Sequence, residues 1–373
     1  MASTTDGRPE LDDSSPEIED TKARRAVESA VEGIDAERVE GWFSEHLPSV
    51  TLPLTFSLIA GGRSNLTYLV VDADGTRFAL RRPPLSHVLP TAHDMAREFR
   101  VISALGPTGF PVPRALGLCQ DPDVNGAPFY VMEFVDGHIL RDAASAGDAL
   151  DEQARGRAGR SLAETLATLH AVDVDAVGLG DFAKREGYIE RQLRRWYEQF
   201  RNSKVEGDGP DTATIVGAVH DRLAADIPEQ RGVAIVHGDF RLDNTVLADD
   251  GSVRAVLDWE ICTLGDPLAD VGLLMVYWTE PGDVAALIGV TPTTLPGFPP
   301  RAQMRQWYAE RSGRDLSRLD FYVAFGYWKL ACILQGVYAR YVGGAAAGDR
   351  SSVDGFAHSV VTLAEAALST LEQ

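Results

Sequence analysis

The chain has 373 residues, 45% of them hydrophobic, which is enough for two domains or for one large two-lobed domain with a well-buried core. Its formal net charge is −20. A field of that sign repels phosphate backbones and argues against nucleic acid as a partner. The cysteines Cys119, Cys262 and Cys332 have no metal-binding spacing, so we expect them to be core residues in a reducing cytoplasm.

Two segments bear on secretion and membrane insertion. Residues 1–21 hold no apolar run and carry seven acidic residues against one arginine, so they predict a disordered acidic tail and not a secretory signal. The longest apolar stretch, residues 321–342, is interrupted by Lys329, Gln335 and Arg340. It therefore predicts a buried helix and not a membrane span. We expect no membrane partner.

The first third of the chain predicts a small antiparallel sheet. An amphipathic helix over residues 34–48 precedes strands that begin at residue 52. Two strands within residues 66–82 are joined by Asp74–Gly75, a strong hairpin signal. A helix over residues 92–106 follows, and residues 112–120 and 129–137 predict two more strands. The expected arrangement is a sheet with one helix inserted after its third strand.

From Ala149 onward the pattern is mainly helical. Residues 161–172 and 187–200 show helical spacing, and residues 202–212 predict a polar loop between helices. The one convincing strand pair in this half lies within residues 235–260.

That strand pair, "IVHGDFRLDNTVLADDGSVRAVLDWE", concentrates polar side chains where strands end. Asp239 can accept a proton from an attacking hydroxyl, while Asn244 and Asp258 offer the hard oxygen ligands that Mg²⁺ prefers. Phosphoryl transfer needs these parts: a metal to neutralise charge and a base to orient the nucleophile. Taken alone, Asp243 or Asp249 is more typical of a turn or cap than of a ligand.

Three motifs in the same order resemble the aminoglycoside phosphotransferase family of the protein-kinase-like superfamily. "HGDFRLDN" is similar to its catalytic loop, "LDWE" to its metal-binding strand end, and "GDPLAD" to the segment that follows. Residues 81–105, 187–200 and 330–340 further resemble the kinase-like domain fused to some acyl-CoA dehydrogenases. The resemblance implies a two-lobed α+β fold, with a nucleotide-binding lobe at residues 22–135 and a mainly helical catalytic and substrate-binding lobe at residues 136–373.

The resemblance also implies roles in the second lobe. Asp239 matches the catalytic base, and Asn244 and Asp258 match the metal ligands. His237 matches a residue that braces the loop. Asp266 and Asp270 are expected to support the loop structurally, with helix capping as an equally good alternative for both.

In the first lobe the resemblance implies the nucleotide contacts. Arg81 of "FALRR" stands where relatives carry a lysine, and Glu98 matches its ion-pair partner. Ser64 and Asn65 are expected at the phosphates, and backbone groups of Glu133 and Val135 at the adenine. Because strand side chains alternate, Arg81 shares a face with Ala79, and the neighbouring Arg82 is expected at the surface.

The leading hypothesis is therefore a cytoplasmic enzyme that uses ATP, or alternatively GTP, with Mg²⁺ to phosphorylate a hydroxyl group of a small molecule. The acceptor expected is a hydroxyacyl compound or an aminoglycoside-like alcohol. A nucleotide-binding pseudokinase with a regulatory role is the alternative, although the intact set of Asp239, Asn244 and Asp258 speaks against it. A metal-dependent hydrolase is weaker, because the sequence shows no second cluster of metal ligands. The oligomeric state is left open.

Overall fold

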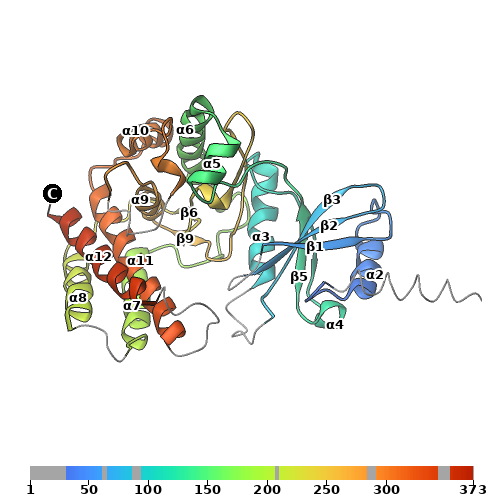
Figure 1. The fold of residues 1–373 in the computed structure, drawn as a ribbon, viewed down its shortest axis with the longest axis horizontal. Coiled ribbons are helices and arrows are strands. Elements are labelled where there is room, and N and C mark those ends of the chain that lie inside the picture. Colours follow the sequence, from blue (N-terminus) through green and yellow to red (C-terminus); the bar gives the residue numbers. More distant parts are fainter. Residues whose placement is uncertain are drawn as a thin grey trace, which may run out of the picture. The chain divides into compact units, whose positions relative to one another are not determined.

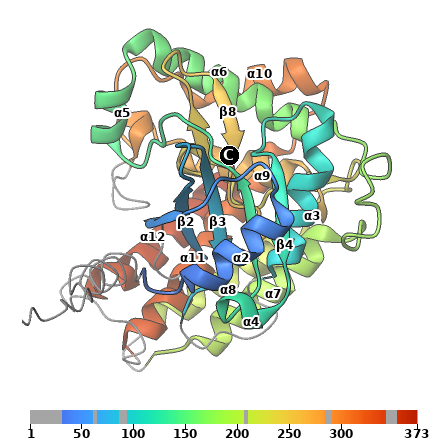
Figure 2. The ribbon, with the colours of Figure 1, turned by 90° about the vertical axis from the view of Figure 1, so that its right-hand side faces the viewer.

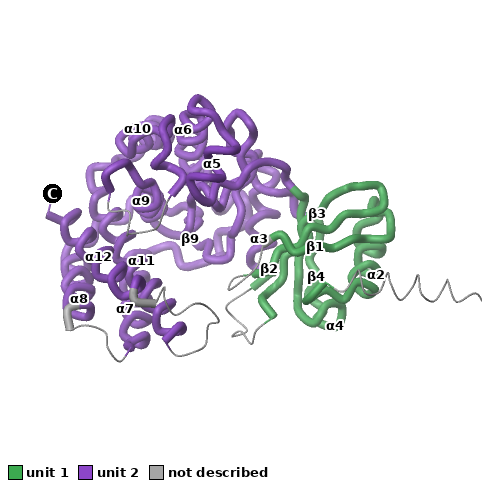
Figure 3. Tube along the Cα trace, viewed as in Figure 1, with its two compact units in different colours: residues 1–95, 116–134 green, residues 96–115, 135–373 purple. Residues whose placement is uncertain are grey.

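The computed structural model describes residues 31–60, 65–85, 94–205, 210–283, 291–342 and 353–372. The chain forms two compact units, coloured separately in Figure 3: unit 1 comprises residues 1–95 and 116–134, and unit 2 comprises residues 96–115 and 135–373. The predicted acidic tail, residues 1–21, lies outside the described residues.

Unit 1 is built on a five-stranded sheet in the order β1-β2-β3-β5-β4. The strands are β1 (Thr55–Ala60), β2 (Leu66–Val71), β3 (Arg77–Arg82), β4 (Ala115–Cys119) and β5 (Phe129–Glu133), and the short helix α4 (Pro122–Asn125) lies between the last two. The β1–β2, β2–β3 and β3–β5 pairs are antiparallel. The predicted antiparallel sheet, and the hairpin turn at Gly75 with φ 83°, are confirmed.

One face of this sheet is covered by α2 (Ala36–His46), which begins at Asp35, whose side chain accepts a hydrogen bond from the Arg38 amide. Figure 2 shows α2 lying across the strands. Its buried Trp42 and Phe43 join a hydrophobic core with Tyr68 and Leu80. Every second residue of β2, β3 and β5 faces this core. Ala79 and Arg81 consequently lie on the opposite face, as predicted.

Unit 2 is mainly helical (Figure 1). Its helices are α3 (Met95–Leu105, whose first residue belongs to unit 1), α5 (Ala143–Ala149), α6 (Glu152–Leu169), α7 (Tyr188–Asn202), α8 (Pro210–Ala225), α9 (Leu268–Tyr277), α10 (Arg301–Ser312), α11 (Leu319–Val342) and α12 (Val353–Leu371), with 3-10 turns η1 (Gly106–Thr108), η2 (Leu242–Asn244) and η3 (Pro292–Thr294). The predicted helices in residues 161–172 and 187–200, and the buried helix in residues 321–342, are confirmed. α11 packs against α7, α8, α9 and α12. No helix of the described residues is long and apolar enough to cross a membrane.

Two small antiparallel ladders carry the polar segment of unit 2. β6 (Ala234–Val236) pairs with β9 (Thr263–Gly265), and β7 (Thr245–Leu247) pairs with β8 (Val253–Val256). The sequence predicts a single strand pair here. In the structure the first strand of that pair is two strands, β6 and β7, separated by the polar loop of residues 237–244. The loop changes the direction of the chain, so that β7 pairs with β8 as predicted, whereas β6 pairs with β9.

Candidate active site

The β7–β8 ladder brings the two candidate metal ligands together. Thr245 pairs with Val256, and the Leu257 amide donates to the Asn244 carbonyl at 2.8 Å. Asn244 and Asp258 therefore stand at adjacent ends of paired strands. Within the described residues, Asp258 is the one non-glycine residue with a left-handed backbone, at φ 63°. Residues other than glycine seldom adopt this left-handed backbone conformation, and those that are held in it are concentrated at functional sites.

Asp239 is held by its neighbours in the same loop. The Asn244 Nδ2 donates to the Asp239 backbone carbonyl at 2.8 Å and to Oδ2 at 3.0 Å. Since its amide nitrogen is used in this way, the Asn244 Oδ1 is the atom available as a metal ligand. The loop thus joins the candidate base and a candidate ligand in one hydrogen-bonded set.

Two residues near Asp239 were not singled out from the sequence. Arg241 places Nε 3.3 Å from Asp239 Oδ2 and 2.9 Å from Asp243 Oδ1, with its guanidinium over the Tyr277 ring. Burial alone would lower the pKa of Arg241, but the carboxylates of Asp239 and Asp243 outweigh it and raise that pKa. Burial and the neighbouring Asp239, including a hydrogen bond to it, raise the pKa of Tyr277. Arg241 lies inside the recognised motif, whereas nothing in the local sequence links Tyr277 to the loop.

The backbone before Asp239 is fixed by Asp270 from the first turn of α9. Its Oδ2 accepts from the His237 amide at 2.7 Å and its Oδ1 from the Gly238 amide at 2.8 Å. The His237 Nδ1 accepts from the Asp239 amide at 3.3 Å, so Nε2 is the protonated nitrogen that donates to the Leu257 carbonyl at 2.8 Å. His237 therefore connects the loop of Asp239 to the residue before Asp258.

A buried polar chain continues behind this brace. Asp270 accepts from His170 Nε2 at 3.3 Å, and His170 Nδ1 lies 2.9 Å from the Tyr308 hydroxyl. Asp266 accepts from the Leu268 amide at 3.0 Å, near the start of α9, and from the Tyr322 hydroxyl at 2.7 Å. Asp266 thus contacts a helix start and a neighbouring helix, while Asp270 contacts the loop itself.

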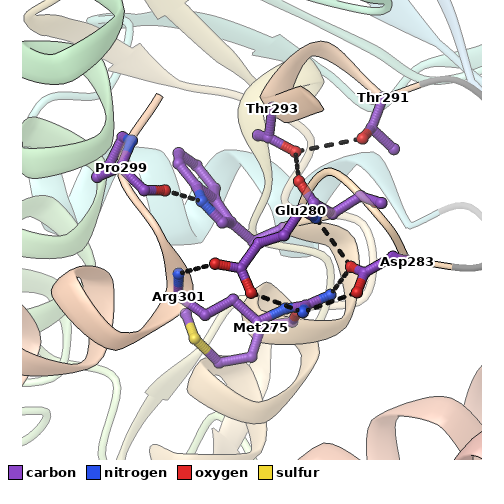
Figure 4. A network of polar contacts seen from close by, with 9 residues as sticks. Met275, Glu280, Asp283, Thr291, Thr293, Pro299 and Arg301 are labelled. Carbon is purple, nitrogen blue, oxygen red and sulfur yellow. Dashed lines mark hydrogen bonds and ion pairs between the residues drawn. The ribbon is translucent and has the colours of Figure 1, made fainter. Parts of the chain in front are cut away.

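A pocket of about 80 Å³ opens beside the loop, lined by Leu140, Arg141, Arg241, Leu242, Asp243, Leu274, Tyr277, Trp278 and residues 291–293. Figure 4 shows a polar network around the segment after α9, which includes Thr291 and Thr293 of the pocket lining. Arg301 forms ion pairs with Glu280 and Asp283 and donates to the Met275 carbonyl, while Thr293 donates to the Thr279 carbonyl. The Thr293 hydrogen bond ties residues 291–293, which line the pocket, to the segment that follows α9.

The donor set suits a cation that is shared with a ligand. The described residues contain no group of three or more histidine, cysteine, aspartate or glutamate side chains that could hold a metal alone. Mg²⁺ typically takes one or two carboxylates and completes its shell with water and phosphate oxygens. Asn244 Oδ1 and the Asp258 carboxylate fit that pattern.

Unit 1 contains four of the six residues expected to contact the nucleotide or its ion pair: Ser64, Asn65, Arg81 and Glu133. Asn65 is buried where β2 begins, and Ser64 lies outside the described residues. Arg81 is buried and donates to the Thr67 hydroxyl at 3.3 Å, on the face that carries Ala79. Glu133 is the last residue of β5, and it is exposed.

The other two expected contacts belong to unit 2: Val135 follows directly after unit 1 and is half-buried, and Glu98 is buried on α3. Glu98 and Arg81 lie in different units, and their pairing stays a prediction.

The surface position predicted for Arg82 is wrong. Its side chain is 6% exposed and donates to the backbone carbonyls of Gly33 and Asn125. Arg82 shares the sheet face that carries Leu80, and the segment before α2 together with α4 covers its end of the strand. Strand alternation gave the correct face, but the local sequence did not show what lies against it.

The comparisons with known proteins agree on one family. A model of the phosphotransferase enzyme family matches residues 55–307. Mouse acyl-CoA dehydrogenase family member 10 is 35% identical over 300 residues, which make up 79% of this chain and 27% of that protein. The chain spans less than half the length of this and the similar rat family member 11, which it matches at 34% identity.

Solved structures show the same fold. A Ralstonia eutropha protein described as an aminoglycoside phosphotransferase is 32% identical, with a TM-score of 0.73, covering 89% of this chain and 98% of that one. Choline kinase from Cryptosporidium parvum has a TM-score of 0.62 at 12% identity, covering 91% and 96%, a likeness of fold alone. The predicted two-lobed, kinase-like α+β fold is confirmed.

Proposed function

The chain belongs to the phosphotransferase enzyme family, and on that premise we propose that it transfers a phosphoryl group from ATP, with Mg²⁺, to a hydroxyl group of a small molecule. The observation that carries the proposal is the set formed by Asp239, Asn244 and Asp258. A hydrogen bond joins the first two, and the β7–β8 ladder places the third beside them.

Each member of the set has a role in this proposal. The nucleotide, when bound, would supply the phosphoryl group, and Mg²⁺ would neutralise part of its charge. Asp239 accepts the proton of the acceptor hydroxyl and orients its oxygen, while the Asn244 amide keeps Oδ2 in place. Asn244 Oδ1 and the Asp258 carboxylate would hold the cation. The Asp270 brace keeps the loop rigid, so that little reorganisation is needed during the reaction.

The proposal extends to the nucleotide and the acceptor. Arg81 would meet the phosphates and Glu98, and it can grip phosphate oxygens with two nitrogens. Ser64 and Asn65 would contribute phosphate contacts, and the backbones of Glu133 and Val135 would bind the adenine. The pocket beside Arg241 and Tyr277 would receive part of a hydroxyacyl or aminoglycoside-like acceptor. The acyl-CoA dehydrogenase relatives favour the hydroxyacyl class.

Calorimetric titration with ATP tests the metal assignment. We expect wild-type protein to bind ATP more tightly with Mg²⁺ than in EDTA, and Asp258→Ala to lose that difference. Asp249→Ala is the matched control, because Asp249 is an exposed carboxylate of the same hairpin that contacts His138. A full Mg²⁺ effect in Asp258→Ala would remove Asp258 from the metal site.

The regulatory alternative predicts nucleotide binding without transfer. Steady formation of ADP that depends on an added alcohol separates the two functions. Tight ATP binding with no product from any hydroxyacyl thioester, hydroxyacid, aminoglycoside or amino alcohol would favour the pseudokinase.

A further inference from the structure

α11 carries a buried cation to which the proposed chemistry gives no role. Lys329 is 6% exposed, and its Nζ donates to the Gly238 carbonyl at 3.0 Å. The ammonium also lies 5.7 Å from the centre of the Trp196 ring on α7. Burial lowers the pKa of Lys329, opposed by the carboxylates of Asp239 and Asp270. A buried lysine is costly unless its charge is compensated, so its place beside this loop calls for a reason.

The residue type at this position is unusual for the chain. Only four of its 35 Lys and Arg residues are lysines: Lys22, Lys184, Lys204 and Lys329. Lys184 and Lys204 are exposed. An ammonium is a compact point charge that one carbonyl and nearby carboxylates can satisfy, whereas a planar guanidinium presents five N–H donors in a fixed fork. The site at Gly238 suits the smaller cation.

Both backbone polar groups of Gly238 are hydrogen-bonded. Asp270 accepts from the Gly238 N–H, and Lys329 donates to the Gly238 C=O. Gly238 has φ 87°, and a Cβ there would approach the Ile261 side chain to 3.0 Å. Because the Gly238 carbonyl belongs to the peptide that joins Gly238 to Asp239, holding this residue at both groups sets the direction in which the Asp239 side chain leaves the backbone.

We propose that Lys329 is a positioning residue for Asp239: it fixes the Gly238 carbonyl from α11 and supplies a cation that faces the loop. The role in turnover rests on the proposed function of Asp239 as the base, whereas the hold on the loop does not depend on it. A lysine that only stabilised the fold would affect the unfolding free energy and leave the loop and turnover intact in the folded protein.

Lys329→Met removes the ammonium and keeps most of the apolar stem. Lys329→Arg keeps the positive charge, but its planar guanidinium is larger than the ammonium that the site at Gly238 suits. Lys184→Met is the matched control, since it makes the same substitution at an exposed lysine. All measurements are made well below the melting temperature of each variant, so that each is folded.

The first measurement is amide hydrogen exchange over residues 235–247 in ligand-free protein. A lost hydrogen bond to a charged group typically weakens an interaction by about 1.5–3 kcal/mol, which corresponds to roughly 10–100-fold. We expect exchange at residues 237–239 to rise about 10–100-fold in Lys329→Met, with α6 and the sheet of unit 1 unchanged. Wild-type exchange in the loop, or an equal increase throughout unit 2, would overturn the proposal.

The second measurement is turnover with ATP, Mg²⁺ and whichever hydroxyacyl thioester or aminoglycoside wild type uses fastest. We expect kcat of Lys329→Met to fall about 10–100-fold with the KM for ATP within about twofold, and Lys329→Arg to recover it only partly. If Lys329 acts through Asp239, combining Lys329→Met with Asp239→Asn gives a smaller loss than the product of the two single losses. A double variant whose loss in kcat equals the product of the two single losses would contradict an action of Lys329 through Asp239.

These readouts separate the two proposals. Wild-type protein without transfer to any acceptor would contradict the proposed function, and loop exchange would then decide the structural role of Lys329 by itself. Active wild type with an unaffected Lys329→Met kcat would contradict the positioning role alone.

Discussion

Replacing Asp270 by asparagine should destabilise unit 2 strongly, although the two side chains have nearly the same shape. The Asp270 carboxylate is 1% exposed and accepts from two loop amides and from His170. An amide has one acceptor oxygen, and its NH₂ group would face a buried N–H donor. Each buried donor left without a partner costs about 1–3 kcal/mol, and breaking one side of a buried charged network typically costs about 3–5 kcal/mol. We therefore expect a loss of about 3–5 kcal/mol in the free energy of unfolding.

Urea unfolding at pH 7, followed by tryptophan fluorescence, measures this change. Asp173→Asn is a matched control, because Asp173 also accepts from two backbone amides, those of Asp175 and Ala176, but is exposed. Its loss should be much smaller, since water replaces the missing partner. An Asp270→Asn loss below about 1 kcal/mol would refute the reasoning, because it would mean that the loop amides do not depend on the carboxylate.

Further predictions concern residues around these networks. Arg82→Ala should lower the unfolding free energy by about 2–4 kcal/mol, because it leaves the buried carbonyls of Gly33 and Asn125 without a donor; an unchanged urea midpoint would contradict this. Arg81→Ala should instead raise the KM for ATP markedly while changing stability less, which steady-state kinetics and the same urea assay compare. Burial lowers the pKa of His170 below its unfolded value of about 6.5, so the unfolded chain binds a proton that the folded chain does not. The contribution of His170 to the free energy of unfolding is therefore fully present above about pH 6.5 and is lost as the pH falls below that value. His170→Gln should make the free energy of unfolding, measured by urea unfolding, depend less steeply on pH between about pH 7 and 5.5. A pH dependence as steep as that of the wild type would contradict this prediction.

Local signals predicted much of the fold. Alternation in residues 66–82 gave the strands, the hairpin at Gly75 and the faces of Ala79 and Arg81. Helical spacing gave α6 and α7, and the long apolar stretch with its polar interruptions gave α11. These features depend on residues close together in the chain, so the sequence carries them directly.

Features that depend on distant contacts could not be predicted in this way. β6 pairs with β9, some 30 residues later, after a loop that ends the first ladder. Arg82 is buried because segments 49 and 43 residues away lie against it. Lys329 marked an interruption of an apolar helix, yet only the fold shows that it meets Gly238, 91 residues earlier. The motifs indicated Asp239, Asn244 and Asp258 and, through the resemblance, the support from His237 and Asp270, while the contact of Lys329 with the loop appears only in the fold.

The most direct test of the account is transfer of labelled phosphate from [γ-³²P]ATP to a panel of hydroxyacyl thioesters, hydroxyacids, aminoglycosides and amino alcohols, by wild type and Asp239→Asn at matched ATP saturation. We expect a phosphorylated alcohol that forms only with Mg²⁺, and a kcat about 10²–10⁴-fold lower in Asp239→Asn with nearly unchanged ATP affinity. Transfer by Asp239→Asn at the wild-type rate, or ATP binding by wild type with no transfer to any of these acceptors, would contradict it.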